Sequence, residues 1–322
     1  MLVSSTLILI GLIGLVLSGD RFVTGASALA RNLGVSPLLV GLTIVAFGTS
    51  APEIFVSIIA SLRGNPGIAV GNAIGSNIAN VGLVLGVTAL FIPIEVHSRL
   101  LKREYPILFF IMIVVAAILW DGQLQRLEGT LLLIGMAVLV AYMVWWGLKQ
   151  RNGDPMTAEF TAEIPADMAT WLASLWVIFG LIVLPVSSEI FVQGAVGVAK
   201  YLGVSDLVIG LTVVALGTSL PELFASLMGV IKNEHDIALG NILGSNMFNL
   251  LAVMGIPGLL SPTTLSPAVM HRDFPTMFIL TLLLFFMSYG HRKPGRIGRL
   301  SGTVLLLIYV GYVSLLVYQL GF

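Results

Sequence analysis

The chain has little charge. Only 10% of its 322 residues are Asp, Glu, Lys or Arg, against roughly 25% in an ordinary soluble domain. Hydrophobic residues make up 57% of the sequence, and long apolar runs recur along its whole length. No soluble domain of useful size is left once these runs are assigned to a bilayer. The composition therefore predicts an integral membrane protein.

Cysteine is absent altogether. This excludes disulfides, thiolate metal sites and cysteine nucleophiles. The 16 basic and 16 acidic residues balance to a net charge of zero, and they form no basic face of the kind that binds nucleic acid. A metalloprotease motif such as HExxH is also missing, as is a motif for a nucleophile and its base. We therefore expect neither an enzyme nor a bound cofactor nor a nucleic-acid partner.

Ten apolar stretches are long enough to be candidate membrane spans. They cover residues 5–30, 36–62, 67–92, 104–120, 128–148, 170–198, 206–231, 236–260, 274–290 and 300–319. The single long polar loop follows the fifth span. The fold class we predict is an all-α integral membrane protein with ten transmembrane helices: a first five-helix repeat at 1–148, a cytoplasmic linker at 149–169 and a second five-helix repeat at 170–322.

The two halves repeat each other at a constant offset. Glu53 pairs with Glu222 and Asn80 with Asn249, each 169 residues apart (222 − 53 = 249 − 80 = 169). The same offset relates Asp20 to Glu189, and the segment REYP at 103–106 to RDFP at 272–275. Such a regular offset indicates a duplicated unit.

An odd number of spans per unit makes the second copy enter the bilayer from the opposite side, so we expect inverted repeats. Many secondary transporters are built this way, with the substrate site at the repeat interface and formed by interrupted helices. Lys and Arg are concentrated in the loops that follow odd-numbered spans. The positive-inside rule then places both termini outside and the long middle loop in the cytoplasm of a cell carrying the protein in its plasma or inner membrane.

Helices two and seven are expected to be broken around a carboxylate, in GTSAPE at 48–53 and GTSLPE at 217–222. Pro52 and Pro221 lack an amide hydrogen and disfavour helical geometry in the preceding residue. Carbonyl groups just upstream then need a partner, and a cation is a suitable one. Glu53 and Glu222 follow the prolines, and intramembrane carboxylates are functional candidates by default. This motif supplies Glu53, Thr49, Ser50 and the Ala46 carbonyl, and by repetition Glu222, Thr218, Ser219 and the Ala215 carbonyl.

The second repeated motif is GNAIGSNIAN at 71–80, which recurs as GNILGSNMFN at 240–249. Ser76 and Asn80 are four residues apart and so share one helical face, as do Ser245 and Asn249. We favour these two Asn residues as ligands over the earlier ones in each motif. Together with the glutamates they form an all-oxygen set, which suits a hard cation such as Ca²⁺ or Na⁺ and not Zn²⁺ or Cu⁺.

Charge favours exchange over one-way transport. Two glutamates supply two negative charges, which one Ca²⁺ neutralises. Carboxylates about 5 Å apart repel each other by about 3 kcal/mol at an effective dielectric constant of about 20. An empty site is therefore costly, and the empty carrier should reorient poorly.

These paired motifs resemble the two alpha repeats of the sodium/calcium exchanger family, of the bacterial and archaeal type, within the calcium:cation antiporter superfamily. The resemblance covers nearly the whole chain. It implies a secondary active antiporter that exchanges Na⁺ for Ca²⁺ by alternating access, with helices one and six sliding as a gate across helices two, three, seven and eight. It also implies that Glu53 and Glu222 are the central ligands of both ions, surrounded by the Thr, Ser and Asn residues named above.

Other functions stay open at this stage. The nearest is an H⁺/Ca²⁺ antiporter, which would follow a pH gradient. Potassium-dependent Na⁺/Ca²⁺ exchange is weakened because relatives in that branch carry Asp where this chain has Asn249. A cation channel would also use oxygen-lined broken helices but would show flux without a counter-ion. One chain already contains a complete pathway, so a monomer in membrane lipid suffices for transport, and an oligomer is compatible with it.

Overall fold

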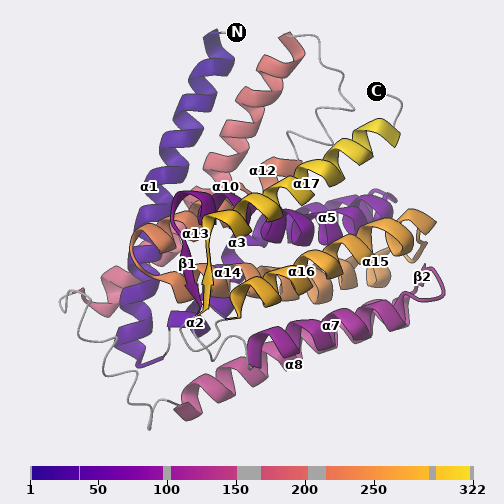
Figure 1. Cartoon of the computed structure of the whole chain (residues 1–322), viewed down its shortest axis with the longest axis horizontal. Helices are drawn as coiled ribbons and strands as arrows, with labels where there is room; N and C mark the ends of the chain where they lie inside the picture. The colour runs from indigo at the N-terminus through magenta and orange to yellow at the C-terminus, as the bar shows by residue number, and fades with distance from the viewer. Residues whose placement is uncertain are drawn as a thin grey trace.

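The computed structural model describes residues 2–35, 37–96, 103–150, 168–201, 215–289 and 295–319 (Figure 1). Nearly all of these residues are helical, which confirms the prediction of a mostly helical membrane protein. Most of the predicted linker and residues 202–214, which include the first part of the predicted seventh span, lie outside the described residues.

The first half begins with one long helix, α1 (Leu2–Leu33). The predicted second span comprises α2 (Pro37–Val40), the π-helical turn η1 (Gly41–Val45), α3 (Ala46–Thr49) and α4 (Ala51–Leu62). The third comprises α5 (Pro66–Ala79), η2 (Asn80–Leu85) and α6 (Gly86–Phe91). The remaining two are α7 (Tyr105–Ile118) and α8 (Arg126–Gln150).

The second half follows the same order. It begins with α10 (Thr170–Tyr201), followed after the gap by α12 (Ala215–Thr218) and α13 (Leu220–Ile231). The next span comprises α14 (His235–Phe248), η5 (Asn249–Val253) and α15 (Met254–Leu260). The turn η6 (Val269–Asp273), α16 (Phe274–Ser288) and α17 (Arg299–Gln319) complete it. The π-helical turns that begin at Asn80 and Asn249 therefore recur at the sequence offset of 169 residues.

Seven described helices are long and apolar enough to cross a membrane, or eight if the bent pair Gly41–Thr49 and Ala51–Leu62 is one span. The helices α7 and α13 are apolar but shorter, with 14 and 12 residues. In α13 the reason is the helix break that precedes it, since half of a broken span cannot reach across the bilayer alone. The count of ten crossings stays a prediction.

Two pairs of short antiparallel strands join the halves, which the sequence did not predict. β1 (Ile94–Val96) pairs with β4 (Gly295–Ile297), and β2 (Gln123–Leu124) pairs with β3 (Thr263–Thr264). Each strand lies in a connection between helices, where backbone groups outside a helix still need hydrogen-bond partners.

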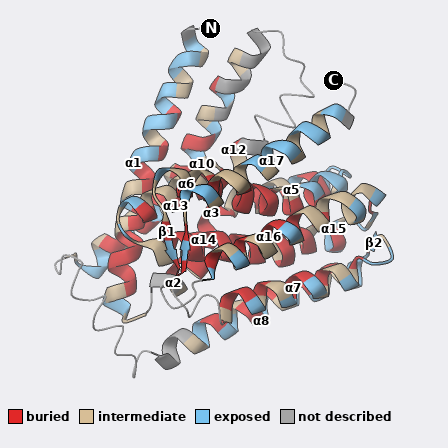
Figure 2. Cartoon of the chain, in the orientation of Figure 1, coloured by how far each residue is buried: buried red, intermediate tan, exposed pale blue. Residues whose placement is uncertain are grey.

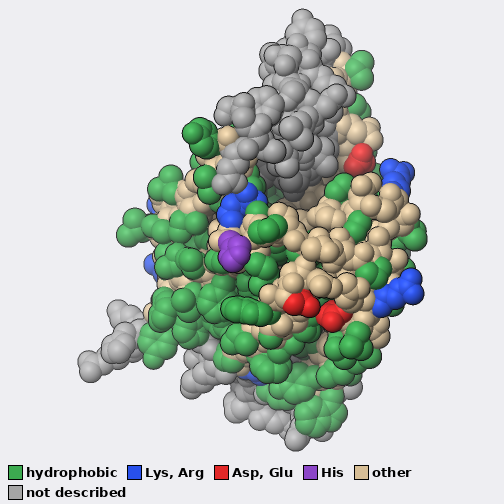
Figure 3. Space-filling model, turned by 90° about the vertical axis from the view of Figure 1, so that its right-hand side faces the viewer, with side chains coloured by type: hydrophobic (Ala, Val, Ile, Leu, Met, Phe, Trp, Pro, Cys, Tyr) green, Lys and Arg blue, Asp and Glu red, His purple; other side chains and the backbone are tan. Residues whose placement is uncertain are grey.

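The helices α1 and α10 run side by side and cross the other helices at a steep angle (Figure 1). The helices α5 and α14 lie in the buried centre, whereas α1 and α17 expose much of their surface (Figure 2). Many large hydrophobic side chains are exposed, and hydrophobic side chains are spread over the face in Figure 3. This is the surface expected of a protein dissolved in lipid.

The halves interlock through their second and third spans. The helix α14 packs on η1 and α3 of the first half, and α5 packs on α12 and η5 of the second. Gly244 allows the first contact, because a Cβ atom there would lie 2.6 Å from both the Leu42 carbonyl oxygen and Ala46 Cβ. This packing places the helix break of one half beside the Asn-containing motif of the other.

Candidate cation site

The two predicted helix breaks are present. Ser50 interrupts the helix with φ −81° and ψ 3°, and α3 meets α4 at 49°. Ser219 has nearly the same conformation, with φ −89° and ψ 2°. Each break lies just before a proline in the first turn of the following helix. The breaks therefore have the cause that the sequence indicated, the missing proline N–H and the strain on the residue before it.

The carbonyl groups near the breaks are partly engaged. The Ala46 carbonyl accepts the Ser50 N–H at 3.0 Å, and the Thr49 hydroxyl oxygen lies 3.4 Å from it. Pro221 has no N–H to offer the Gly217 carbonyl, and that oxygen instead accepts the hydroxyl of Ser188 on α10. Ala215 is placed as the first residue of α12. The carbonyl groups of Ala46 and Ala215 stay predicted ligands.

The two glutamates converge, and both side chains are buried at 1% exposure. Ser50 Oγ, from the first break, lies 3.4 Å from Glu222 Oε1. The side chains of Ser76 and Thr218 lie near the Glu53 carboxylate without a hydrogen bond of normal geometry, and Glu222 also lies near Glu53. Each carboxylate therefore lies near a hydroxyl from the helix break of the other half, and the two would repel each other if both were ionised.

Several oxygens at this point lack a hydrogen-bond partner of normal geometry. Among the described residues, the buried and unsatisfied side-chain atoms include Glu53 Oε1 and Oε2, Glu222 Oε2, Ser219 Oγ, Asn80 Oδ1 and Asn249 Oδ1. All six belong to residues that the sequence predicted as ligands. Unsatisfied buried polar atoms are rare in folded proteins, and each calls for an explanation such as a bound ion. An oxygen set with two carboxylates has the chemistry that a hard cation needs.

Two further Asn residues, which the sequence motifs did not identify, hold the predicted amide ligands. Asn80 donates its amide to Asn246 Oδ1 at 3.1 Å, and Asn249 donates to Asn77 Oδ1 at 3.0 Å. Asn77 donates in turn to the Asn246 carbonyl at 3.2 Å. These bonds use the NH₂ group of each predicted ligand and leave its Oδ1 atom for a cation. The signal was present, because Asn77 and Asn246 also stand 169 residues apart.

The first Asn of each motif holds the backbone around the glutamates. Asn72 donates to the Glu53 carbonyl at 3.2 Å, and Asn241 donates to the Glu222 carbonyl at 3.4 Å. The Thr49 hydroxyl donates to Asn241 Oδ1 at 2.9 Å and lies 3.4 Å from Ser245 Oγ. These contacts agree with the preference for Asn80 and Asn249 as ligands over Asn72 and Asn241.

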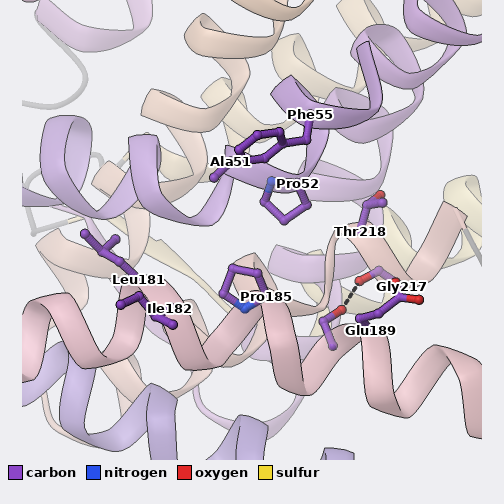
Figure 4. A pocket seen from close by; sticks show the side chains of 10 residues that line it. Ala51, Pro52, Phe55, Leu181, Ile182, Pro185, Glu189, Gly217 and Thr218 are labelled. Carbon is purple, nitrogen blue, oxygen red and sulfur yellow. Dashed lines mark hydrogen bonds between the residues drawn. The ribbon is translucent and has the colours of Figure 1, made fainter. Parts of the chain in front are cut away.

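A cavity of about 250 Å³ lies near the site (Figure 4). Ala51, Pro52 and Phe55 of α4 line it on one side, and α10 lines it from Leu181 to Glu189 on the other. Gly217 and Thr218 complete the lining, beside the hydrogen bond from Ser188 (Figure 4). Pro52 and Thr218 in this lining each neighbour a residue of the predicted ligand set in the sequence, so the cavity lies beside the candidate site.

A helical membrane protein with two broken helices around buried carboxylates, and a cavity beside them, is of the ion-transporter class. The sequence profile of the family described as sodium/calcium exchanger protein matches residues 3–145 and 172–318. The chain belongs to this family, whose members are antiporters and not enzymes.

Similar proteins cover the chain almost completely. It is 48% identical over 316 residues to "Putative antiporter CaxA" of Alkalimonas amylolytica, a match that covers 98% of this chain and 99% of that protein. It is 39% identical over 318 residues to the inner membrane protein YrbG of Escherichia coli K12, covering 98% and 97%. A solved structure of the sodium-calcium exchanger NCX_Mj, soaked with Na⁺ and Sr²⁺, superposes with a TM-score of 0.82 at 34% identity, over 97% of this chain and 98% of that one.

Proposed function

We propose that the chain exchanges Na⁺ for Ca²⁺ across the cell membrane as a secondary active antiporter that works by alternating access. One observation carries the proposal. Six of the unsatisfied buried oxygens among the described residues belong to Glu53, Glu222, Ser219, Asn80 and Asn249, residues that meet where the two halves of the chain cross. A cation bound there would satisfy those atoms and relieve the repulsion between the carboxylates.

The residues have distinct roles in this proposal. Glu53 and Glu222 provide the charge, and Asn80 and Asn249 provide neutral amide oxygens. Hydroxyl groups and two backbone carbonyls complete the ligand set, from Thr49, Ser50, Ser76, Thr218, Ser219 and Ser245, with Ala46 and Ala215. Ca²⁺ and Na⁺ compete for this one site, since both are hard cations that bind oxygen. The ions are transported substrates, and no resident cofactor takes part.

Ten spans arranged as two inverted repeats provide the two access states. In this arrangement both termini face outward and the loop between the halves is cytoplasmic. The cavity beside α10 then opens to the outside, because its exposed lining residue Glu189 lies towards the Tyr201 end of α10. The helices α1 and α10 form the gate, and one chain contains the whole pathway.

Sodium is the proposed coupling ion. The similar solved structure is named a sodium-calcium exchanger. Asn249 leaves the site with two formal charges, which one Ca²⁺ balances. A proton-coupled exchanger would respond instead to a pH gradient.

Transport by purified protein in liposomes tests the proposal. Ca²⁺ flux should follow an imposed Na⁺ gradient, and it should not respond to K⁺ or pH gradients of the same size. Glu53→Gln and Glu222→Gln should each abolish the flux, whereas Glu95→Gln, at an exposed carboxylate of β1, should leave it intact. Flux that follows the pH gradient alone would overturn sodium coupling. Normal flux in both site variants would overturn the site.

A further inference from the structure

An ion pair ties α1 to the end of α13. Lys232 Nζ lies 2.7 Å from Asp20 Oδ1, with the two side chains 30% and 38% exposed. Arg21 approaches the other oxygen of Asp20 at 3.9 Å, and its guanidinium lies 4.9 Å from the ring centre of Trp176 on α10. Lys232 caps the C-terminal end of α13, where the partial negative charge of the helix also favours a cation.

The repeat supplies a second pair with the same chemistry. Asp20 corresponds to Glu189 (189 − 20 = 169), and Lys232 corresponds to Arg63 (232 − 63 = 169). The acids lie on α1 and α10, the two long helices of the gate. The bases both stand at C-terminal caps, Arg63 on α4 and Lys232 on α13. The duplication has therefore kept an acid on each gate helix and a base on the helix that follows each break.

The second pair is not formed. Glu189 is exposed, lines the cavity and, among the residues that the structure describes, accepts only a local hydrogen bond from Gln193 at 3.0 Å. Arg63 is exposed at the end of α4. Across the described ranges, neither side chain has an ion-pair partner.

The helices also pack more closely beside the ion pair that is formed than beside the pair that is not formed. Gly19 of α1 lies against α13 so closely that a Cβ atom there would be 3.3 Å from the Phe224 carbonyl oxygen. The corresponding residues are Ser188 and Phe55. Both line the cavity, and Phe55 is 64% exposed. The contact between α1 and α13 is therefore closed beside Asp20 and Lys232. The corresponding contact between α10 and α4 is open beside Glu189 and Arg63.

We infer that the ion pairs Asp20–Lys232 and Glu189–Arg63 form alternately during the exchange cycle and that each holds one side of the protein closed, an inference that rests on the proposed function. We call these two ion pairs latches. The first pair holds α1 against α13 while the cavity on the other side is open. When α10 closes over the cavity, Glu189 reaches Arg63 and the first pair separates. One ion pair replaces another, so the two end states stay close in free energy.

Thiol labelling measures the two states directly, because the chain has no native cysteine. Phe55→Cys reports the side that is open here, and Phe224→Cys reports the opposite side. The rate of reaction with a charged methanethiosulfonate reagent is measured on purified protein in detergent, where both faces are accessible. Elution volume and melting temperature select the variants that remain folded.

Each neutralised latch should slow labelling of the reporter on the opposite face. Asp20→Asn and Lys232→Gln should slow reaction at position 55, and Glu189→Gln and Arg63→Gln should slow reaction at position 224. A partly exposed ion pair changes a two-state ratio by roughly two- to five-fold, so an effect of that size is expected where the states are comparably populated. Exchanging the charges with Asp20→Lys and Lys232→Asp together should restore the rate at position 55.

Arg126→Gln is the matched control, since it removes an exposed charge at the start of α8. Rates in the four latch variants that equal this control would overturn the inference, as would a charge exchange that restores nothing. The readout needs neither Na⁺ nor Ca²⁺ transport. Latch effects without exchange in liposomes would contradict the proposed function alone, and exchange without latch effects would contradict the latches alone.

Discussion

The hydroxyl oxygen of Ser50 lies 3.4 Å from Glu222 Oε1, although 172 residues separate the two in sequence. A residue of the first helix break thus touches the carboxylate that follows the second. Thr218 and Glu53 lie near each other in the reciprocal arrangement. Because each half contributes to the surroundings of the other half's glutamate, the site exists only when the two repeats are packed together.

Removing the amide that holds a predicted ligand should weaken cation binding. Asn77→Ala takes away the acceptor for Asn249, and Asn246→Ala takes away the acceptor for Asn80. A lost buried hydrogen bond costs about 1–1.5 kcal/mol, so we expect the Kd for Ca²⁺ to rise about ten-fold in each variant. Calorimetric titration measures it. Asn65→Ala, at an exposed side chain, should bind as the parent does, and equal affinities in all three variants would contradict a positioning role.

Adding a third carboxylate should change the response to pH. Asn249→Asp places a new negative charge beside two that already repel each other, so Ca²⁺ should bind more tightly at alkaline pH than in the parent. At acid pH the added group binds a proton and the advantage should vanish. The affinity of the variant should therefore fall more steeply with decreasing pH. Parallel pH profiles for the variant and the parent would show that position 249 does not face the ion.

Enlarging Gly244 should damage the site through packing. A Cβ atom at Gly244 would press on the Leu42 carbonyl and on Ala46, at the helix that carries the first break. We expect Gly244→Ala to lower the melting temperature by several degrees and to reduce Ca²⁺ affinity, since overpacking costs about 1–3 kcal/mol. Gly311→Ala is the matched control. A Cβ atom there meets nothing within 4 Å, and alanine is the better helix former.

One buried hydrogen bond should affect stability without altering the ligand set. Ser57 Oγ donates to the Val253 carbonyl at 2.7 Å and joins α4 to the π-helical turn η5. Ser57→Ala leaves that carbonyl without this donor, so we expect a loss of about 1–2 kcal/mol in the free energy of unfolding. Thermal unfolding in detergent measures it. Thr130→Ala, whose hydroxyl bonds to its own helix at an exposed position, should melt with the parent.

Much of the site could be predicted from sequence because the duplication repeats it. Pro52 and Pro221 fix the breaks by local chemistry, and the 169-residue offset marked the Glu and Asn residues that follow. The roles of Asn77 and Asn246 could not be predicted, since they depend on which half packs against which. The strand pairs depend likewise on contacts between connections far apart in the chain. The unequal closure of the two sides could not be predicted either, since the duplication gives both sides the same motifs.

Equilibrium Ca²⁺ binding to the parent, to Glu53→Gln, to Glu222→Gln and to the double variant tests the central claim most directly. If both carboxylates hold one ion, the parent binds Ca²⁺ with a charge-dependent affinity that either substitution removes, and the double variant is no worse than either single variant. Two independent losses that add up in the double variant, or binding that survives both substitutions, would contradict a shared site.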